Sequence, residues 1–129
     1  MQQNTEWLEE VLANVKIKAL NEMQLASMEA HSQKNDIILL SATGSGKTLA
    51  FLIPLVSMLQ ADPSKTKAII IVPSRELAMQ IEHVFKSMGL NLKVTCCYGG
   101  HKREIEENNL KQAPALLIGT PGRLADHIR

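Results

Sequence analysis

Residues 41–48, Ser-Ala-Thr-Gly-Ser-Gly-Lys-Thr, follow an apolar run and precede a helical pattern. A glycine-rich turn between a strand and a helix lets backbone N–H groups turn inward around phosphates, and the N-terminus of the helix adds positive potential. In such a loop Lys47 brings a positive charge to the phosphates and the hydroxyl of Thr48 is a ligand for Mg²⁺. The general pattern has glycine where this chain has Ser41. The stretch predicts a nucleotide phosphate site formed by Thr43, Gly44, Ser45, Gly46, Lys47 and Thr48.

A turn that only joins a strand to a helix is the alternative to a phosphate site, and the alignment of strand, Gly-x-Gly-Lys-Thr and helix disfavours it. Around this loop the hydrophobic periodicity alternates between helix and buried strand. We expect a strand buried on both faces from Asp36 to Ser41, and further strands at 67–72, 92–98 and 115–119. Helices are expected at 5–15, from Asn21 as N-cap to about Gln33, and at 47–60, 75–88, 101–111 and from Pro121 onward. Strands separated by crossover helices predict an α/β fold with a parallel sheet and helices on both faces.

The composition is that of one ordinary globular domain. The chain has 129 residues, is 45% hydrophobic and 21% charged, and carries a net charge of +1, which excludes a strongly basic tail. Aromatic residues make up only 3%, too few for a platform that stacks bases, so any nucleic acid would be held by its backbone. The longest apolar run, Leu49–Val56, is too short to span a bilayer, so we expect no membrane association. Cys96 and Cys97 are adjacent, which makes a disulfide implausible and favours a reducing, cytoplasmic location.

The other strand-to-helix turns also carry anion-friendly residues. Arg75 follows Pro73 and Ser74 in the first turn of a helix, where the dipole disfavours a cation unless an external anion is bound. The alternatives are an ion pair between Arg75 and a local carboxylate, and plain helix capping at each turn. Because the carboxyl ends of parallel strands share one edge, these turns together predict a surface for a phosphate chain. Its residues would be Pro73, Arg75, Gly99, Gly100, Thr120, Pro121, Gly122 and Arg123.

These motifs resemble those of the first RecA-like domain of DEAD-box ATP-dependent RNA helicases, and the likeness runs from about Trp7 to Arg129. Residues 41–48 resemble motif I of that family, and residues 73–80, Pro-Ser-Arg-Glu-Leu-Ala-Met-Gln, resemble motif Ia. Gly99-Gly100 matches the glycine doublet of the family, and Thr120-Pro121-Gly122-Arg123 matches motif Ib. The resemblance implies a RecA-like P-loop domain over residues 1–129, with a helical Q-motif region at about 5–34.

The same resemblance singles out Gln24 as the adenine-reading glutamine of the Q motif. A carboxamide can pair with N6 and N7 of adenine. Trp7 lies where the family carries an aromatic residue that packs near the base, whereas Leu20 and Asn21 depart from the usual Pro-Thr. Spacing alone would favour the alternative, a solvent-facing glutamine on a helix.

The implied function is the ATP-binding lobe of an RNA helicase with RNA-stimulated ATPase activity, using ATP and Mg²⁺, with Lys47 and Thr48 in the catalytic site and Thr48 on the metal. The Asp-Glu-Ala-Asp motif, the Ser-Ala-Thr motif and a second RecA-like domain would follow Arg129, so we expect a truncated chain that hydrolyses ATP poorly alone. Its partners would be single-stranded or duplex RNA and that second domain, and we expect a monomer. The alternatives are a related DNA helicase and a P-loop module that regulates a partner without hydrolysis.

Two further expectations concern the remaining polar residues. The histidines lack metal-ligand spacing, and the pair Cys96 and Cys97 inside a strand predicts core packing, so no metal other than Mg²⁺ is expected. The run Lys102–Lys111 mixes both charge signs and predicts a helix face in contact with solvent.

Overall fold

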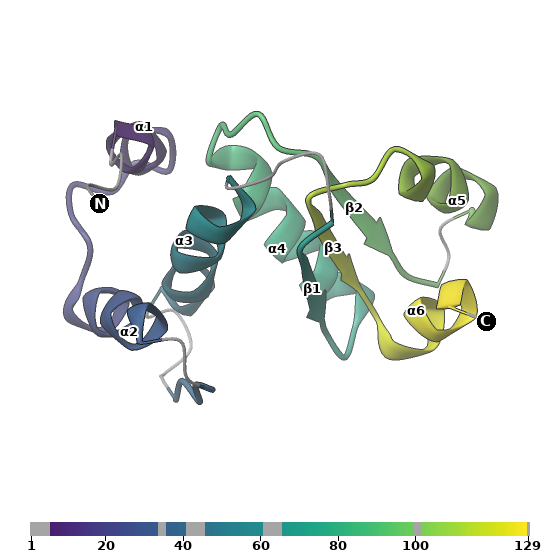
Figure 1. Ribbon diagram of the computed structural model, residues 1–129, viewed down its shortest axis with the longest axis horizontal. Coiled ribbons are helices and arrows are strands. Elements are labelled where there is room, and N and C mark those ends of the chain that lie inside the picture. The colour runs from purple at the N-terminus through teal and green to yellow at the C-terminus, as the bar shows by residue number, and fades with distance from the viewer. Residues whose placement is uncertain (1–5, 34–35, 41–45, 61–65, 100–101, 129) are drawn as a thin grey trace. The chain divides into compact units, whose positions relative to one another are not determined.

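The computed structural model describes residues 6–33, 36–40, 46–60, 66–99 and 102–128 (Figure 1). The chain forms two compact units. The first comprises Met1–Ser57 with Val84–Leu90, and the second Met58–His83 with Asn91–Arg129. Among the described residues, no helix combines the length and the apolar character that crossing a membrane requires.

The first unit is helical. It contains α1 (Glu6–Asn14), α2 (Glu22–Ser32), most of α3 (Lys47–Leu59) and the end of α4 (Arg75–Ser87). Its core is formed by side chains that are at most 2% exposed: Val11, Leu52, Ile53, Val56, Phe85 and Met88. The hydroxyl of Ser27 on α2 donates a hydrogen bond to the carbonyl oxygen of Ala50 on α3 at 2.6 Å, which fixes the two helices against each other.

The predicted N-cap of α2 is confirmed. The side chain of Asn21 accepts a hydrogen bond from the backbone N–H of Gln24 at 2.8 Å, and the side-chain oxygen of Gln24 accepts one from the backbone N–H of Asn21 at 3.0 Å. This reciprocal capping box satisfies backbone donors that the first turn of a helix leaves without partners. The start of α2, where Gln24 lies, is therefore locally determined by sequence.

The second unit contains the sheet. Strands β1 (Ala68–Ile71), β2 (Val94–Cys97) and β3 (Leu116–Gly119) are parallel and lie in the order β1-β3-β2, with β3 in the centre (Figure 1). The register aligns Ile71, Gly119 and Cys97, the last residues of the three strands. The predicted parallel sheet is confirmed, and its carboxyl ends are level.

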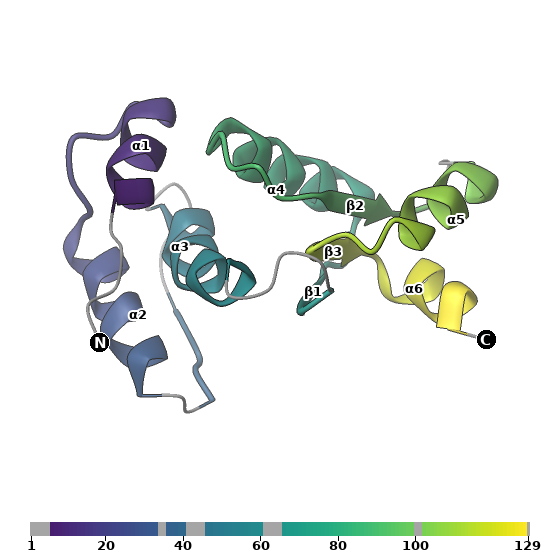
Figure 2. The ribbon, with the colours of Figure 1, turned by 45° about the horizontal axis from the view of Figure 1, so that its top comes forward.

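Helices cover both faces of this sheet. The Cys96 thiol points to α4, where it donates to the carbonyl oxygen of Ala78 at 3.7 Å. On the opposite face lie α5 (Arg103–Lys111) and α6 (Pro121–Ile128), so α4 and α6 flank the strands from opposite sides (Figure 2). The Leu124 side chain of α6 packs so closely on Gly119 that a Cβ there would lie 2.7 Å from it.

The strand expected from Asp36 to Ser41 is not formed in the part that the structure describes. Residues 36–40 are irregular, and Ile38 and Leu40 are 89% and 88% exposed. Residue 41 lies outside the described part. A strand that is buried on both faces needs neighbouring strands to hydrogen-bond its backbone. The described elements of its own unit are helices, which offer no such ladder.

Candidate functional site

The predicted phosphate loop leads directly into α3. Lys47 is the first residue of this helix and Thr48 the second, and both are half-buried. The backbone N–H groups of a first helical turn have no intrahelical acceptor, and they carry the positive end of the helix dipole. Thr43, Gly44 and Ser45 lie outside the described residues. The described part of the loop therefore provides the cationic side chain of Lys47 and the hydroxyl of Thr48 at the N-terminus of α3.

Gln24 connects α2 to this helix start. Its side chain is buried, with 3% exposed, and its Nε2 donates a hydrogen bond to the carbonyl oxygen of Gly46 at 3.2 Å. The alternative of a solvent-facing glutamine is therefore wrong. The carboxamide instead bridges the capping box of α2 and the residue that precedes Lys47.

Glycine is required at position 46. Its φ of +91° belongs to the left-handed region, which L side chains rarely adopt. A Cβ at this position would lie 2.6 Å from Nε2 of Gln24, so a larger residue would also displace the carboxamide. The Gln24 contact and the backbone of the loop are consequently coupled.

A cavity of about 390 Å³ opens beside the loop. It is lined by Gly46, Thr48 and Leu49 at the start of α3, by Val84 and Ser87 of α4, and by residues 14–17 after α1. Among the latter, Lys16 has a φ of +61°, an unfavourable value for a residue with a side chain. Trp7 lies half-buried on α1 and is not among the lining residues.

The second group of predicted residues lies at the carboxyl ends of the strands. We name as the strand-end edge its described members, Pro73, Arg75, Gly99, Thr120, Pro121, Gly122 and Arg123, whereas Gly100 lies outside the described residues. The backbone N–H of Thr120 donates to the carbonyl oxygen of Cys97 at 3.1 Å, which joins the ends of β2 and β3. Gly99 and Gly122 are exposed, and a Cβ at either would meet nothing within 4 Å.

Arg75 has the local partner that the alternative interpretation expected. Its Nε lies 3.4 Å from Oε1 of Glu76, and both side chains are more than half exposed, at 58% and 70%. Exposed pairs of this kind contribute little to stability, about 0–1 kcal/mol. The Ser74 hydroxyl accepts a hydrogen bond from the backbone N–H of Leu77 at 3.2 Å and so caps the start of α4.

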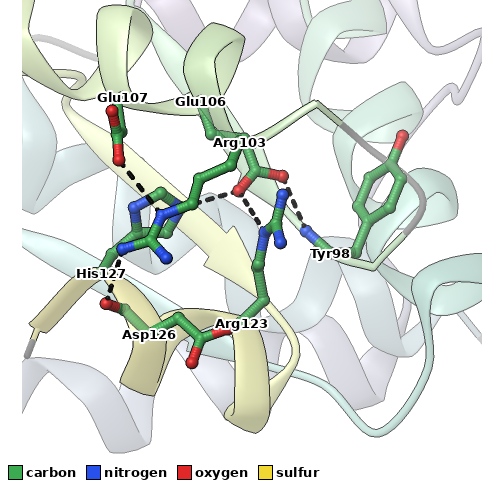
Figure 3. Close-up of polar contacts among 7 residues, drawn as sticks. All are labelled: Tyr98, Arg103, Glu106, Glu107, Arg123, Asp126 and His127. Atoms are coloured by element: carbon green, nitrogen blue, oxygen red, sulfur yellow. Dashed lines mark hydrogen bonds and ion pairs between the residues drawn. The ribbon is translucent and has the colours of Figure 1, made fainter.

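Arg123 is bound by a residue that the sequence analysis missed. Its Nε donates to Oε1 of Glu106 at 2.8 Å, and the same oxygen accepts from Nε2 of His127 at 2.7 Å (Figure 3). The other carboxylate oxygen accepts from the backbone N–H of Tyr98 at 3.1 Å. Burial raises the pKa of Glu106, but the hydrogen bonds from His127, Arg123 and Tyr98 outweigh it and hold the pKa below its ordinary value.

The expectation that Lys102–Lys111 is a helix face in contact with solvent is therefore wrong at Glu106. Glu106 is fully buried, whereas Glu104 and Glu107 beside it are exposed. No sequence signal distinguishes these glutamates, because the burial of Glu106 depends on partners 17 and 21 residues downstream. Its charge is compensated by the arginine and by the hydrogen bonds from His127 and Tyr98, as a buried carboxylate requires.

The ligand atoms of Cys97, Glu106 and His127 lie within 4.8 Å of one another, a spacing that a metal ion could bridge. Burial, reinforced by the charge of Glu106, raises the pKa of the Cys97 thiol to about 12, whereas a metal needs the thiolate. The guanidinium of Arg123 already supplies a cation to the carboxylate. The cluster therefore fits a hydrogen-bonded ionic network better than a metal centre.

Known proteins are similar to this chain in sequence and in fold. The family model described as DEAD/DEAH box helicase matches residues 21–129. The ATP-dependent RNA helicase DBP8 of Yarrowia lipolytica is 39% identical over 126 residues, which are 96% of this chain and 28% of that protein. The DBP8 helicase of Candida albicans is 40% identical over 124 residues, with 95% and 28% covered.

Solved structures give the same result. The DEAD-box helicase Mss116 bound to ssRNA and UDP-BeF matches with a TM-score of 0.85 at 30% identity over 94% of this chain and 27% of that chain. A hypothetical ATP-dependent RNA helicase from Sulfolobus tokodaii matches with a TM-score of 0.80 at 28% identity over 95% and 36%. The chain thus spans about a third or less of these relatives. The RecA-like α/β fold is confirmed, and the chain belongs to the DEAD/DEAH box helicase family.

Proposed function

We propose that this chain is the ATP-binding lobe of an ATP-dependent RNA helicase, which binds ATP with Mg²⁺ at residues 41–48 and the RNA backbone at the strand-end edge. The observation that carries the ATP site is the hydrogen bond from Gln24 to the carbonyl oxygen of Gly46. It joins the segment that resembles the adenine-reading motif to the segment that resembles the phosphate loop. An ATP molecule bound at this junction would have its base beside one segment and its phosphates beside the other.

The residues that open α3 suit a Mg²⁺-bound triphosphate. The ammonium of Lys47 would neutralise phosphate charge, and the backbone N–H groups of the first turn would donate to phosphate oxygens. The hydroxyl of Thr48, which lines the cavity, would be a ligand of the metal. Mg²⁺, when bound, would draw the phosphate oxygens together and reduce their negative charge.

Gln24 retains the chemistry that adenine requires. A carboxamide has two N–H donors and two acceptor lone pairs. One donor serves Gly46 and one lone pair serves Asn21. The second N–H would donate to N7 of adenine, and the second lone pair of the oxygen would accept from the N6 amino group. Trp7, half-buried on α1, would pack near the base as the family resemblance implies.

The proposal for RNA is supported by the level ends of the three strands. Because Ile71, Gly119 and Cys97 share one register position, the turns that follow them lie along one edge. Strand spacing of about 4.8 Å would place their donors within reach of successive phosphates. The solved relative Mss116 was determined with ssRNA and a nucleotide analogue. Contacts of this kind would be independent of base sequence.

Titration with a fluorescent ATP analogue tests the nucleotide site. Lys47→Ala removes a charged contact of about 1.5–3 kcal/mol, so affinity should fall roughly ten- to a hundredfold. Lys67→Ala, at an exposed lysine next to β1, is the matched control and should bind like the wild type. Equal affinity of the Lys47 variant would refute the site. Repeating the titration with single-stranded RNA or DNA of one sequence present would separate an RNA from a DNA helicase.

A further inference from the structure

The buried carboxylate of Glu106 links two of the segments that form the strand-end edge. Glu106 is 0% exposed on α5, a helix whose flanking residues 103–105 and 107–108 are all exposed. Glutamate is almost never fully buried unless it is paired. Its side chain therefore interacts only within the described part of the protein, and its partners show which segments it connects.

Those partners come from the segments that carry the strand-end edge. The backbone N–H of Tyr98, the residue before Gly99, is held by one carboxylate oxygen, and Arg123 is held by the other. His127, one turn further along α6 than Arg123, shares the second oxygen (Figure 3). The carboxylate thus links the turn after β2 to the helix that follows β3.

The contact to Arg123 fixes more than one atom. The guanidinium is planar and rigid, so a hydrogen bond at Nε orients the whole group. The side chain of Arg123 is 18% exposed, so only a small part of it reaches the surface. A long side chain without such an anchor would sample many rotamers, and binding a phosphate would cost that entropy.

We infer that Glu106 is a positioning residue for RNA: it orients Arg123 and the backbone at Tyr98 and so presents the strand-end edge to the phosphates. This inference rests on the proposed RNA-binding function. It predicts a change in RNA affinity opposite to the one that simple electrostatics predicts for removal of the Glu106 charge. Removal of a negative charge near a polyanion should raise affinity, whereas loss of the anchor should lower it.

Glu106→Gln tests the sign with little change in shape. A carboxamide has one acceptor oxygen, so at least one of the donors from Tyr98, Arg123 and His127 would face an N–H₂ group. We expect the affinity of the chain for a fluorescent single-stranded oligouridylate to fall about three- to tenfold at low salt, and further in Glu106→Ala. The matched control is Glu107→Gln, whose exposed carboxylate pairs with Arg103 at 3.1 Å and whose RNA affinity should stay equal or rise slightly.

A double-mutant cycle with Arg123→Ala separates positioning from general damage. If Glu106 acts mainly through Arg123, Glu106→Gln should weaken RNA binding much less in the Arg123→Ala background than in the wild type, with only the contribution of the Tyr98 turn remaining. Circular dichroism spectra and thermal unfolding confirm that each variant is folded, and Glu106→Gln carries the test if Glu106→Ala does not fold. Unchanged or tighter binding by folded Glu106→Gln, with weak binding by Arg123→Ala, would overturn the inference alone. Unchanged binding by Arg123→Ala would overturn the proposed RNA role of that residue as well.

Discussion

The side-chain amide of Gln24 lies 3.2 Å from the carbonyl oxygen of Gly46, while its oxygen caps α2 through Asn21. One carboxamide therefore joins two segments that are 22 residues apart in sequence. The contact is possible because residue 46 has no side chain: a Cβ would lie 2.6 Å from Nε2. The proposed nucleotide site and the stability of the first unit consequently depend on the same glycine.

Gly46→Ala should weaken both properties. Alanine at a φ of +91° costs about 1–2 kcal/mol, and the new methyl group would also displace Gln24. Denaturant unfolding should show this loss, and the affinity for an ATP analogue should fall with it. Gly122→Ala is the control, because its Cβ has open space within α6 and alanine favours a helix. A Gly46 variant as stable as the wild type would contradict the strained geometry.

At Lys16, beside the cavity, a substitution should stabilise the chain rather than destabilise it. Lys16 has a φ of +61°, which costs a side-chain-bearing residue about 1–2 kcal/mol, while glycine adds about 0.4–1 kcal/mol of unfolded-state entropy. Lys16→Gly should therefore raise the free energy of unfolding by up to about 1.5 kcal/mol. Lys18→Gly should lower it, because Lys18 is not among the described residues with positive φ. If both variants were destabilised equally, position 16 would not be strained.

Much of this fold was predictable because its signals are local. The Asn21 cap, the helix at 75–88 and the strand runs 67–72 and 115–119 depend on neighbouring residues, and each was confirmed within a few residues. The strand predicted at 36–41 was wrong over its described part because an apolar run specifies burial but not the neighbouring strands that would pair with it.

The candidate sites show the same limit. The motifs indicated the start of α3 and the turns after the strands, because glycine, proline and capping residues reveal backbone geometry. They did not indicate Glu106, since its burial results from Arg123 and His127, which only the tertiary fold brings to it. Nor did they show that Gln24 is buried.

The network of Glu106 predicts a dependence of stability on acid. Because the pKa of Glu106 is lower in the folded chain than its ordinary value of 4.5, the folded state favours the ionised form. The corresponding stabilisation is complete above pH 4.5 and is lost as the pH falls through the lower folded-state pKa. In urea unfolding between pH 3 and pH 7, the free energy of unfolding of the wild type should exceed that of Glu106→Gln at neutral pH. This difference should become smaller as the pH falls. Glu107→Gln should parallel the wild type, and a constant difference for Glu106→Gln would contradict the linkage.

The strand-end edge predicts how RNA binding depends on salt. If it contacts three or four phosphates, counterion release gives a log–log slope of roughly −2 to −3, at about −0.7 per phosphate on a single strand. Arg75→Ala should flatten this slope by somewhat less than one unit and weaken binding equally for every RNA sequence, because the contact is to the backbone. Arg75 is 58% exposed and its contact with Glu76 is 3.4 Å long, so a phosphate could replace that partner at little cost.

The control is Lys111→Ala, which removes an exposed cation at the end of α5 and should leave the slope unchanged. The slope is measured by fluorescence anisotropy titrations from 50 to 300 mM KCl on two RNAs of different base composition. An affinity that followed base identity and hardly responded to salt would show instead that these turns only cap their helices.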